Sequence, residues 1–200
     1  MKAMKLMVLG LVLVGASANA AEWNLDKGHS SVNFAVKHLV VSTVTGQFDS
    51  FRATVKSEKA DFSDAQIAFE ADVDSINTKN AQRDGHLKSA DFFDAVAYPT
   101  VSFVSRSARR VSGSDFRVTG DLTMRGVTKE VVLDVTYSGT VAGFGGGQVA
   151  AFEIQGRINR FDFGLQWNGL TEAGGVVVSS EVKLEIFAEL NQAQSEAVAA

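Results

Sequence analysis

The chain has 200 residues, a length that gives one domain or at most two small ones. Hydrophobic residues make up 46% of it, which excludes a largely disordered chain. With 23 acidic against 19 basic residues and no basic run, the composition argues against nucleic acid and anionic membrane surfaces as partners. Cysteine is absent, so an oxidising compartment is allowed, but no disulfide stabilises the fold.

The first twenty residues have the pattern of a secretory leader. Lys2 and Lys5 form a basic start, an apolar run follows from Leu6 to Val14, and Ala18-Asn19-Ala20 provides a cleavage site of small residues. Because the apolar run is too short to span a bilayer, we expect cleavage after Ala20, export to the periplasm and no stable membrane anchor. Cleavage removes two lysines, so the mature chain has 17 basic and 23 acidic residues and a net charge of −6.

Alternation of apolar and polar residues dominates the rest of the chain and predicts about eight strands, each with one dry and one wet face. The expected strands are 32–36, 44–56, 67–73, 100–106, 116–124, 131–135, 152–158 and 182–188. Phe48 and Phe51 are three residues apart in one of them, so we expect a bend near Asp49-Ser50. A helix over 77–87 with Thr78 as its N-cap, and a loop that ends at Pro99, form an insert between two strands.

Strands that are apolar on one face must bury that face, either by closing into a barrel or by stacking on a second sheet. An eight-stranded barrel can fill its lumen with side chains or keep room for one small ligand. A β-sandwich is the rival architecture, and the alternation alone does not separate the two.

Several segments in order along the chain match a known pattern. They are Trp23-Asn24-Leu25-Asp26 with His29-Ser30, Phe34-Ala35-Val36-Lys37-His38-Leu39, Gly46-Gln47-Phe48, Asp74-Ser75-Ile76-Asn77-Thr78, the block from Arg83 to Asp94, Tyr98-Pro99, Gly120-Asp121-Leu122-Thr123 with Gly126-Val127-Thr128-Lys129, and Phe161-Asp162-Phe163-Gly164. In them the chain resembles the YceI-like family of periplasmic, lipocalin-like polyisoprenoid-binding proteins. The resemblance implies an all-β, eight-stranded antiparallel lipocalin-like barrel with a short helical insert. It also implies an elongated apolar pore for an isoprenoid tail, and a homodimer.

The candidate ligand-binding residues lie on apolar strand faces or in the family-like segments. They are Phe34, Val36, His38, Phe48, Arg83, Phe92, Phe93, Leu122, Met124 and Phe163. His38 either ends the core face of its strand or touches a head group at the mouth of the pore. The charged run from Arg83 to Lys88 is either a solvated helix face or a lid whose charges meet a pyrophosphate or quinone head.

Patterns of catalysis and metal binding are missing from the sequence. There is no G-x-S-x-G elbow, and His29, His38 and His86 have no close metal-ligand spacing with one another. We therefore expect a carrier without catalytic residues, metal or cofactor, whose ligand is an isoprenoid lipid such as a polyprenyl compound or ubiquinone. An enzyme acting on such a lipid and a packed-barrel structural or stress protein are the alternatives. The lipid-binding domain is expected over 21–190, followed by a polar tail over 191–200.

Overall fold

The computed structural model describes residues 20–144, 146–169 and 177–193. The expected leader therefore lies outside the described residues, apart from Ala20, and so do residues 194–200 of the expected tail. Within the described ranges no helix is long and apolar enough to cross a membrane.

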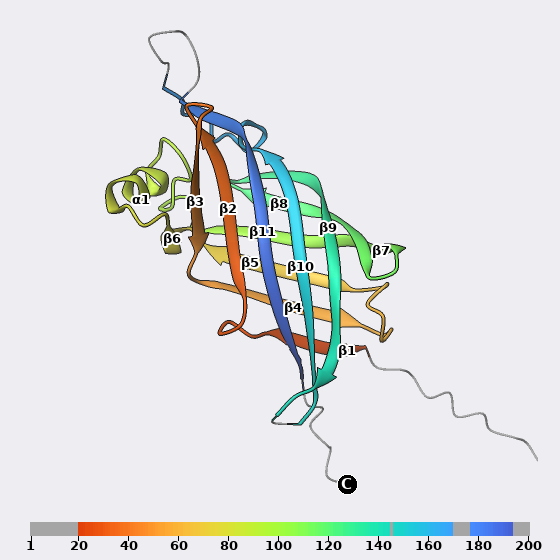
Figure 1. Cartoon of the computed structure of the whole chain (residues 1–200). Coiled ribbons are helices and arrows are strands. Elements are labelled where there is room, and N and C mark those ends of the chain that lie inside the picture. The colour runs from red at the N-terminus through yellow and green to blue at the C-terminus, as the bar shows by residue number, and fades with distance from the viewer. Residues whose placement is uncertain (1–19, 145, 170–176, 194–200) are drawn as a thin grey trace, which may run out of the picture.

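Long antiparallel strands make up most of the described chain (Figure 1). The strands are β1 (Ala21–Leu25), β2 (Ser31–His38), β3 (Ser42–Phe48), β4 (Phe51–Ser57), β5 (Gln66–Asp72), β6 (Ile76–Asn77), β7 (Thr100–Ser112), β8 (Asp115–Met124), β9 (Val127–Ala142), β10 (Gln148–Asn159) and β11 (Val178–Gln192). The helices are α1 (Ala81–Lys88) and two short 3-10 helices, η1 (Val73–Ser75) and η2 (Arg160–Phe163).

Eight of these strands close into a ring in the order β1-β4-β5-β7-β8-β9-β10-β11, and β11 pairs again with β1. The predicted antiparallel barrel is therefore confirmed, and the β-sandwich is excluded. Closure leaves the ring without an unpaired edge, because every strand in it has two neighbours. Strands β2, β3 and β6 extend the sheet from β11 and form an additional part of the wall.

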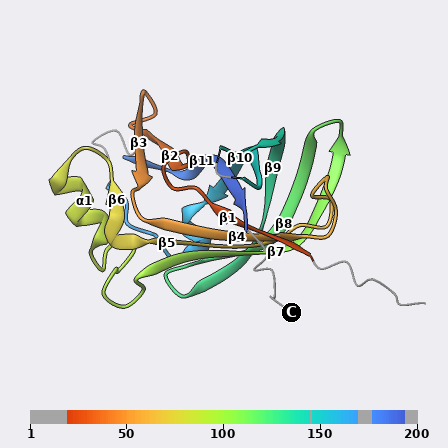
Figure 2. The same cartoon turned by 90° about the horizontal axis from the view of Figure 1, so that it is seen from below.

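Strand β11 has a different partner at each of its ends. Residues 178–187 pair with β2, whereas residues 190–192 pair with β1. The barrel is consequently elongated, with β2, β11, β10 and β9 on one side and β1, β4, β5 and β7 on the other (Figure 2). The insert that carries η1, β6 and α1 lies beside one end of the barrel, at the left of both views.

The bend predicted near Asp49-Ser50 is confirmed, because β3 ends at Phe48 and β4 begins at Phe51. Two backbone hydrogen bonds hold the break: the amide of Asp49 donates to Ser75, and the amide of Asp72 donates to Ser50. With the chain turned here, Phe48 and Phe51 both face the lumen.

The helix of the insert begins later than predicted, and Thr78 as its N-cap is wrong. Asn80 caps α1 instead, and its side chain accepts the amide of Arg83 at 3.0 Å. Lys79 has a positive φ of 62°, which turns the chain between Thr78 and the helix. The hydroxyl of Thr78 then bonds Asp84 inside the insert.

Candidate functional site

The lumen of the barrel holds a cavity of about 270 Å³. Its walls are the inward faces of the strands that the alternation predicts, such as Phe116, Val118 and Leu122 of β8. Apart from Ser30 and Arg160, every lining residue is hydrophobic. Apolar walls with few polar groups are what a hydrocarbon ligand requires, although this volume lies just below the ~300–1,000 Å³ typical of small-molecule sites.

Seven of the ten predicted ligand-binding residues line this cavity. They are Phe34, Val36, Phe48, Phe92, Phe93, Leu122 and Met124. Three of their rings form a row across the lumen, with centroids 6.0 Å apart for Phe34 and Phe48 and 6.3 Å apart for Phe48 and Phe93. The structure thus brings together residues of two strands and of the insert, and their contact with lipid stays a prediction.

The position of Phe34 depends on a glycine in the neighbouring strand. Gly46 of β3 lies opposite Phe34 of β2 in the register, and a Cβ atom at Gly46 would overlap the Phe34 ring. The bare backbone therefore lets an aromatic ring lie flat across the adjacent strand, an arrangement that fixes both the ring and the register.

The other three predicted residues do not line the cavity. Phe163, which we expected in the lining, is only 1% exposed and packs in the core behind it, because η2 turns the chain there. His38 ends β2 opposite Val178, two residues beyond Val36. Arg83 is engaged inside the insert, where its guanidinium donates to the hydroxyl and the carbonyl oxygen of Thr78 at 2.7 and 2.8 Å. Its role as a head-group contact is therefore not favoured.

In the described part of the cavity wall, the one charged side chain is Arg160, which sequence reasoning missed. It is 3% exposed, and its guanidinium donates four hydrogen bonds to backbone carbonyl oxygens. The acceptors are Ser179, Leu165, Trp167 and Val178. Among the described residues it has no acidic partner, and burial away from water lowers its pKa.

The signal for Arg160 was nevertheless in the sequence. The inward face of β10 runs through Phe152, Ile154 and Ile158, and one more step of two residues reaches Arg160. An arginine that continues an apolar period is expected to face inward, where it needs several acceptors because a buried cation without partners is costly.

An aromatic group surrounds Arg160 at this end of the cavity. The guanidinium lies 5.9 Å from the centroid of the Phe92 ring, and the centroids of the Phe92 and Trp167 rings are 5.3 Å apart. His86 meets both rings edge-on, at 5.1 Å from Phe92 and 4.8 Å from Trp167. Of the charged run in the insert, His86 is thus the residue that the structure brings next to this end of the lumen.

The opposite end of the cavity is closed by a second aromatic group. Phe62, from the loop between β4 and β5, is 4% exposed although its φ is +57°. Its ring contacts Trp23, Tyr137 and Phe152 at centroid distances of 5.1, 5.5 and 5.0 Å. Sequence reasoning missed this aromatic group, because Phe62 lies in a loop where no periodicity applies.

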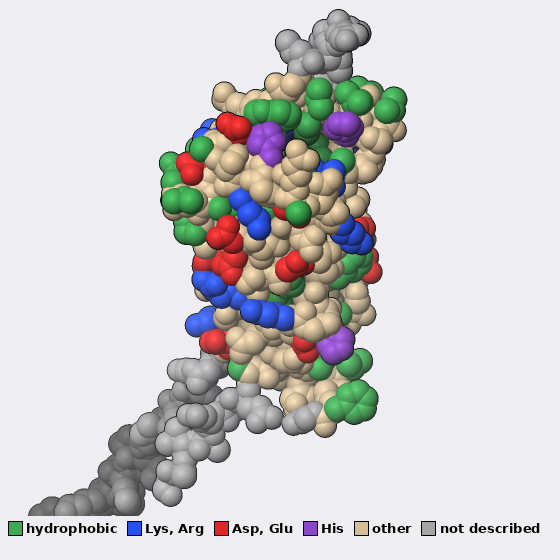
Figure 3. Space-filling model, turned by 90° about the vertical axis from the view of Figure 1, so that its left-hand side faces the viewer, with side chains coloured by type: hydrophobic (Ala, Val, Ile, Leu, Met, Phe, Trp, Pro, Cys, Tyr) green, Lys and Arg blue, Asp and Glu red, His purple; other side chains and the backbone are tan. Residues whose placement is uncertain are grey.

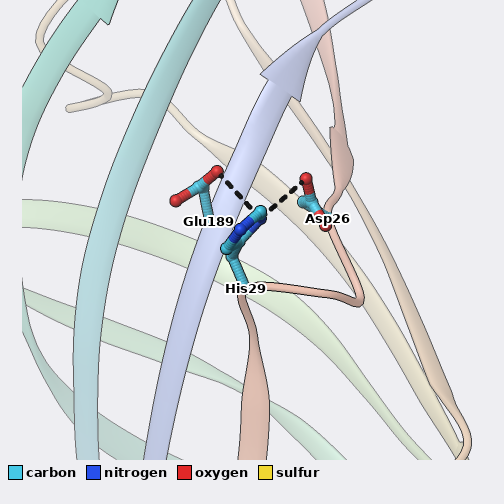
Figure 4. A group of neighbouring side chains, drawn as sticks. All are labelled: Asp26, His29 and Glu189. Carbon is cyan, nitrogen blue, oxygen red and sulfur yellow. Dashed lines mark ion pairs between the residues drawn. The ribbon is translucent and has the colours of Figure 1, made fainter.

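Outside the barrel, one histidine joins two carboxylates (Figure 4). The Nδ1 atom of His29 lies 3.2 Å from Asp26 and 3.5 Å from Glu189. These ion pairs raise the pKa of His29, first through the hydrogen bond with Asp26 and then through the charge of Glu189. Because Asp26 also accepts bonds from Gly28 and Asn191, we interpret the cluster as a clasp that ties the loop between β1 and β2 to β11.

The closed barrel with an apolar lumen and a helical insert defines a lipocalin-like class of protein. The chain belongs to the YceI-like domain family, whose pattern matches residues 23–190, and the predicted family is thereby confirmed. A UPF0312 protein of Staphylococcus aureus strain MSSA476 is 39% identical over 170 residues, which are 84% of this chain and 96% of the relative.

Two solved structures share the fold. The crystal structure of BcnA from Burkholderia cenocepacia is 25% identical, with a TM-score of 0.72 over 82% of this chain and 98% of that chain. A polyisoprenoid-binding domain from Saccharophagus degradans, implicated in plant cell wall breakdown, is 18% identical, with a TM-score of 0.59 over 86% of this chain and 98% of that one. At this identity the second likeness shows the fold alone.

Proposed function

We propose that this protein binds an isoprenoid lipid, a polyprenyl compound or a quinone such as ubiquinone, with the tail inside the barrel. The observation that carries the proposal is the continuous hydrophobic lining of the lumen. Enclosing one five-carbon isoprene unit is worth roughly 3–4 kcal/mol at about 0.8 kcal/mol per carbon. A few units therefore offset the entropic cost of association, and the tail supplies most of the affinity.

The head of the lipid belongs at the Arg160 end. A guanidinium has five N–H donors, and four of those of Arg160 have carbonyl partners within the described chain. The remaining N–H suits a single oxygen acceptor, whereas a bidentate phosphate contact would need two. The rings of Phe92 and Trp167 beside it offer flat apolar faces to the first part of the ligand.

Binding without catalysis fits the polar groups in the wall. Ser30 is already bonded, since its hydroxyl accepts the amide of Glu189 at 3.0 Å. The guanidinium of Arg160 can only donate hydrogen bonds, and it stays charged across the physiological range, so it cannot act as a base. The described lining residues therefore include no nucleophile with a base beside it. The cavity argues equally against a barrel that is merely packed.

Native mass spectrometry of the protein purified without added lipid tests the proposal. We expect a co-purifying species whose mass equals that of a polyprenyl compound or quinone and which organic extraction releases. A protein that carries no such lipid, and takes up none when ubiquinone is supplied in detergent, would contradict it. Conversion of the lipid into a new species during incubation would favour the enzyme.

The same preparation tests the cellular setting that we propose, a periplasmic carrier that works as a homodimer. N-terminal sequencing of protein from the periplasmic fraction should begin at Ala21. Intact mass at native conditions should show two copies. A chain that still begins at Met1 would argue against export to the periplasm. A chain that stays monomeric at micromolar concentration would argue against the homodimer.

A further inference from the structure

The turn between β2 and β3 exposes three consecutive hydrophobic side chains. Leu39, Val40 and Val41 are 42%, 78% and 83% exposed. Single exposed apolar residues are ordinary, but a run of three at the tip of a hairpin is a feature that soluble proteins avoid unless it is used.

The backbone of this tip is strained. Leu39 and Val40 have φ values of 50° and 64°, in the left-handed region that glycine and asparagine adopt easily and β-branched residues avoid. Asn or Gly would adopt this backbone conformation with less strain and would expose no large apolar side chain. The tip therefore holds apolar side chains in water at a cost to the fold, which points to a use outside the folded core.

The tip adjoins the Arg160 end of the cavity. The amide of Leu39 donates to Val177, whose own amide donates to Gly169. Next to Gly169 is Trp167, which is 36% exposed. Val178, which pairs with His38, belongs to the cavity lining. One connected set of residues thus leads from the exposed tip to the lumen.

The hairpin itself carries no acidic side chain. In a chain with 23 acidic residues, the segment 34–48 contains none, and its charged side chain is Lys37. Figure 3 shows hydrophobic side chains gathered at the upper end of the molecule, where this hairpin lies in Figure 1. The other end also exposes Phe144, but there the Phe62 ring is only 4% exposed, and the carboxylates of Asp26 and Glu189 lie beside His29.

We propose that Leu39, Val40, Val41 and Trp167 dock the barrel on a bilayer of zwitterionic lipids, so that the isoprenoid passes between membrane and cavity at this end. The inference rests on the proposed function. The aliphatic side chains enter the interface, and the indole lies at its boundary, where tryptophan is favoured. Because the protein as a whole is acidic, insertion rather than charge attraction supplies the binding, and anionic lipid weakens it.

Flotation of the full mature protein with vesicles of phosphatidylethanolamine and phosphatidylcholine tests the proposal. The variant Val40→Asn/Val41→Asn removes two inserted side chains and relieves the strain at Val40, so it folds at least as well as the wild type. We expect its partitioning onto vesicles to fall by about tenfold or more. The control Val104→Asn/Val132→Asn changes two outward strand residues that are 56% and 48% exposed, and should float like the wild type.

Binding of ubiquinone in detergent, measured on the same proteins, separates this proposal from the proposed function. Loss of flotation by the tip variant with unchanged binding in detergent supports the docking surface. Equal flotation of tip variant and wild type, or no flotation of the wild type, overturns it. A tip variant that turns from dimer to monomer in light scattering overturns it too, because the tip then contacts a second copy. A wild type that floats, unlike its tip variant, but neither carries a co-purifying lipid nor takes up ubiquinone in detergent refutes the proposed function instead and leaves the docking surface supported.

Discussion

Replacing Val36 by tryptophan tests whether the lumen is space for a ligand. Val36 lies on the inward face of β2, and its side chain borders a cavity of about 270 Å³. In a filled core the larger ring would overpack and destabilise the protein by roughly 1–3 kcal/mol. In this barrel the indole has open volume to enter. We therefore expect the free energy of unfolding of the lipid-free protein to fall by less than about 1 kcal/mol.

The same substitution should abolish most of the lipid affinity. The indole occupies at least the space of one isoprene unit, whose burial is worth roughly 3–4 kcal/mol. At 1.4 kcal/mol per factor of ten, binding weakens about 100- to 1,000-fold.

Denaturant unfolding of delipidated protein, beside titration with ubiquinone in detergent, measures both effects. Val104→Trp is the matched control, because that valine faces outward from β7 and should change neither quantity by much. A Val36→Trp protein that loses stability yet binds lipid as the wild type does would refute the reasoning.

Three further changes test the ends of the cavity and the clasp. Phe62→Ala removes a plug with three aromatic neighbours and should cost about 3–5 kcal/mol of unfolding free energy; a loss under about 1 kcal/mol would show that the loop does not close the lumen. Arg160→Met removes the guanidinium that donates to four carbonyl oxygens, of which that of Val178 keeps a bond from the Asn168 amide, and should cost at least about 3 kcal/mol in denaturant unfolding. The stability of Arg160→Lys should lie between those of Arg160→Met and the wild type. An Arg160→Met protein as stable as the wild type would contradict the assigned bonds. His29 has a pKa raised above 6.5 in the fold, chiefly by Asp26, so its contribution is full below pH 6.5 and is lost as the pH rises through the higher folded-state value. The difference in melting temperature between wild type and His29→Asn should therefore shrink from pH 6 towards pH 9, and a difference that grows would exclude the ion pairs of Figure 4.

The barrel itself could be predicted from the sequence because its strands are amphipathic. Alternation along β8 and β11 assigns the inward faces correctly, since side chains of a strand point to opposite sides by geometry alone. The bend between Phe48 and Phe51 followed from the same rule. Closure did not, because two sheets stacked on one another bury the same faces, and the resemblance to a known family was needed to decide.

The Phe62 end of the cavity and the burial of Phe163 could not be predicted from the sequence, for a different reason. Phe62 lies in a loop, and its aromatic neighbours come from β1, β9 and β10. This aromatic group therefore forms only once the strands have closed into a barrel. Phe163 and Arg160 are separated by two residues, yet the turn of η2 buries the first ring in the core and leaves the second side chain in the cavity wall. Contacts of this kind depend on how distant segments are placed in the fold, and local sequence patterns carry no information about that placement.

The aromatic group around Phe62 also gives the lumen a floor. A cavity that is closed at one end has a fixed depth, so it limits how many isoprene units of a lipid tail can enter. Each added isoprene unit should strengthen binding until the tail reaches the Phe62 ring. Longer tails would leave their surplus units at the Arg160 end, where those units meet water or the membrane, and the affinity should stop rising with length.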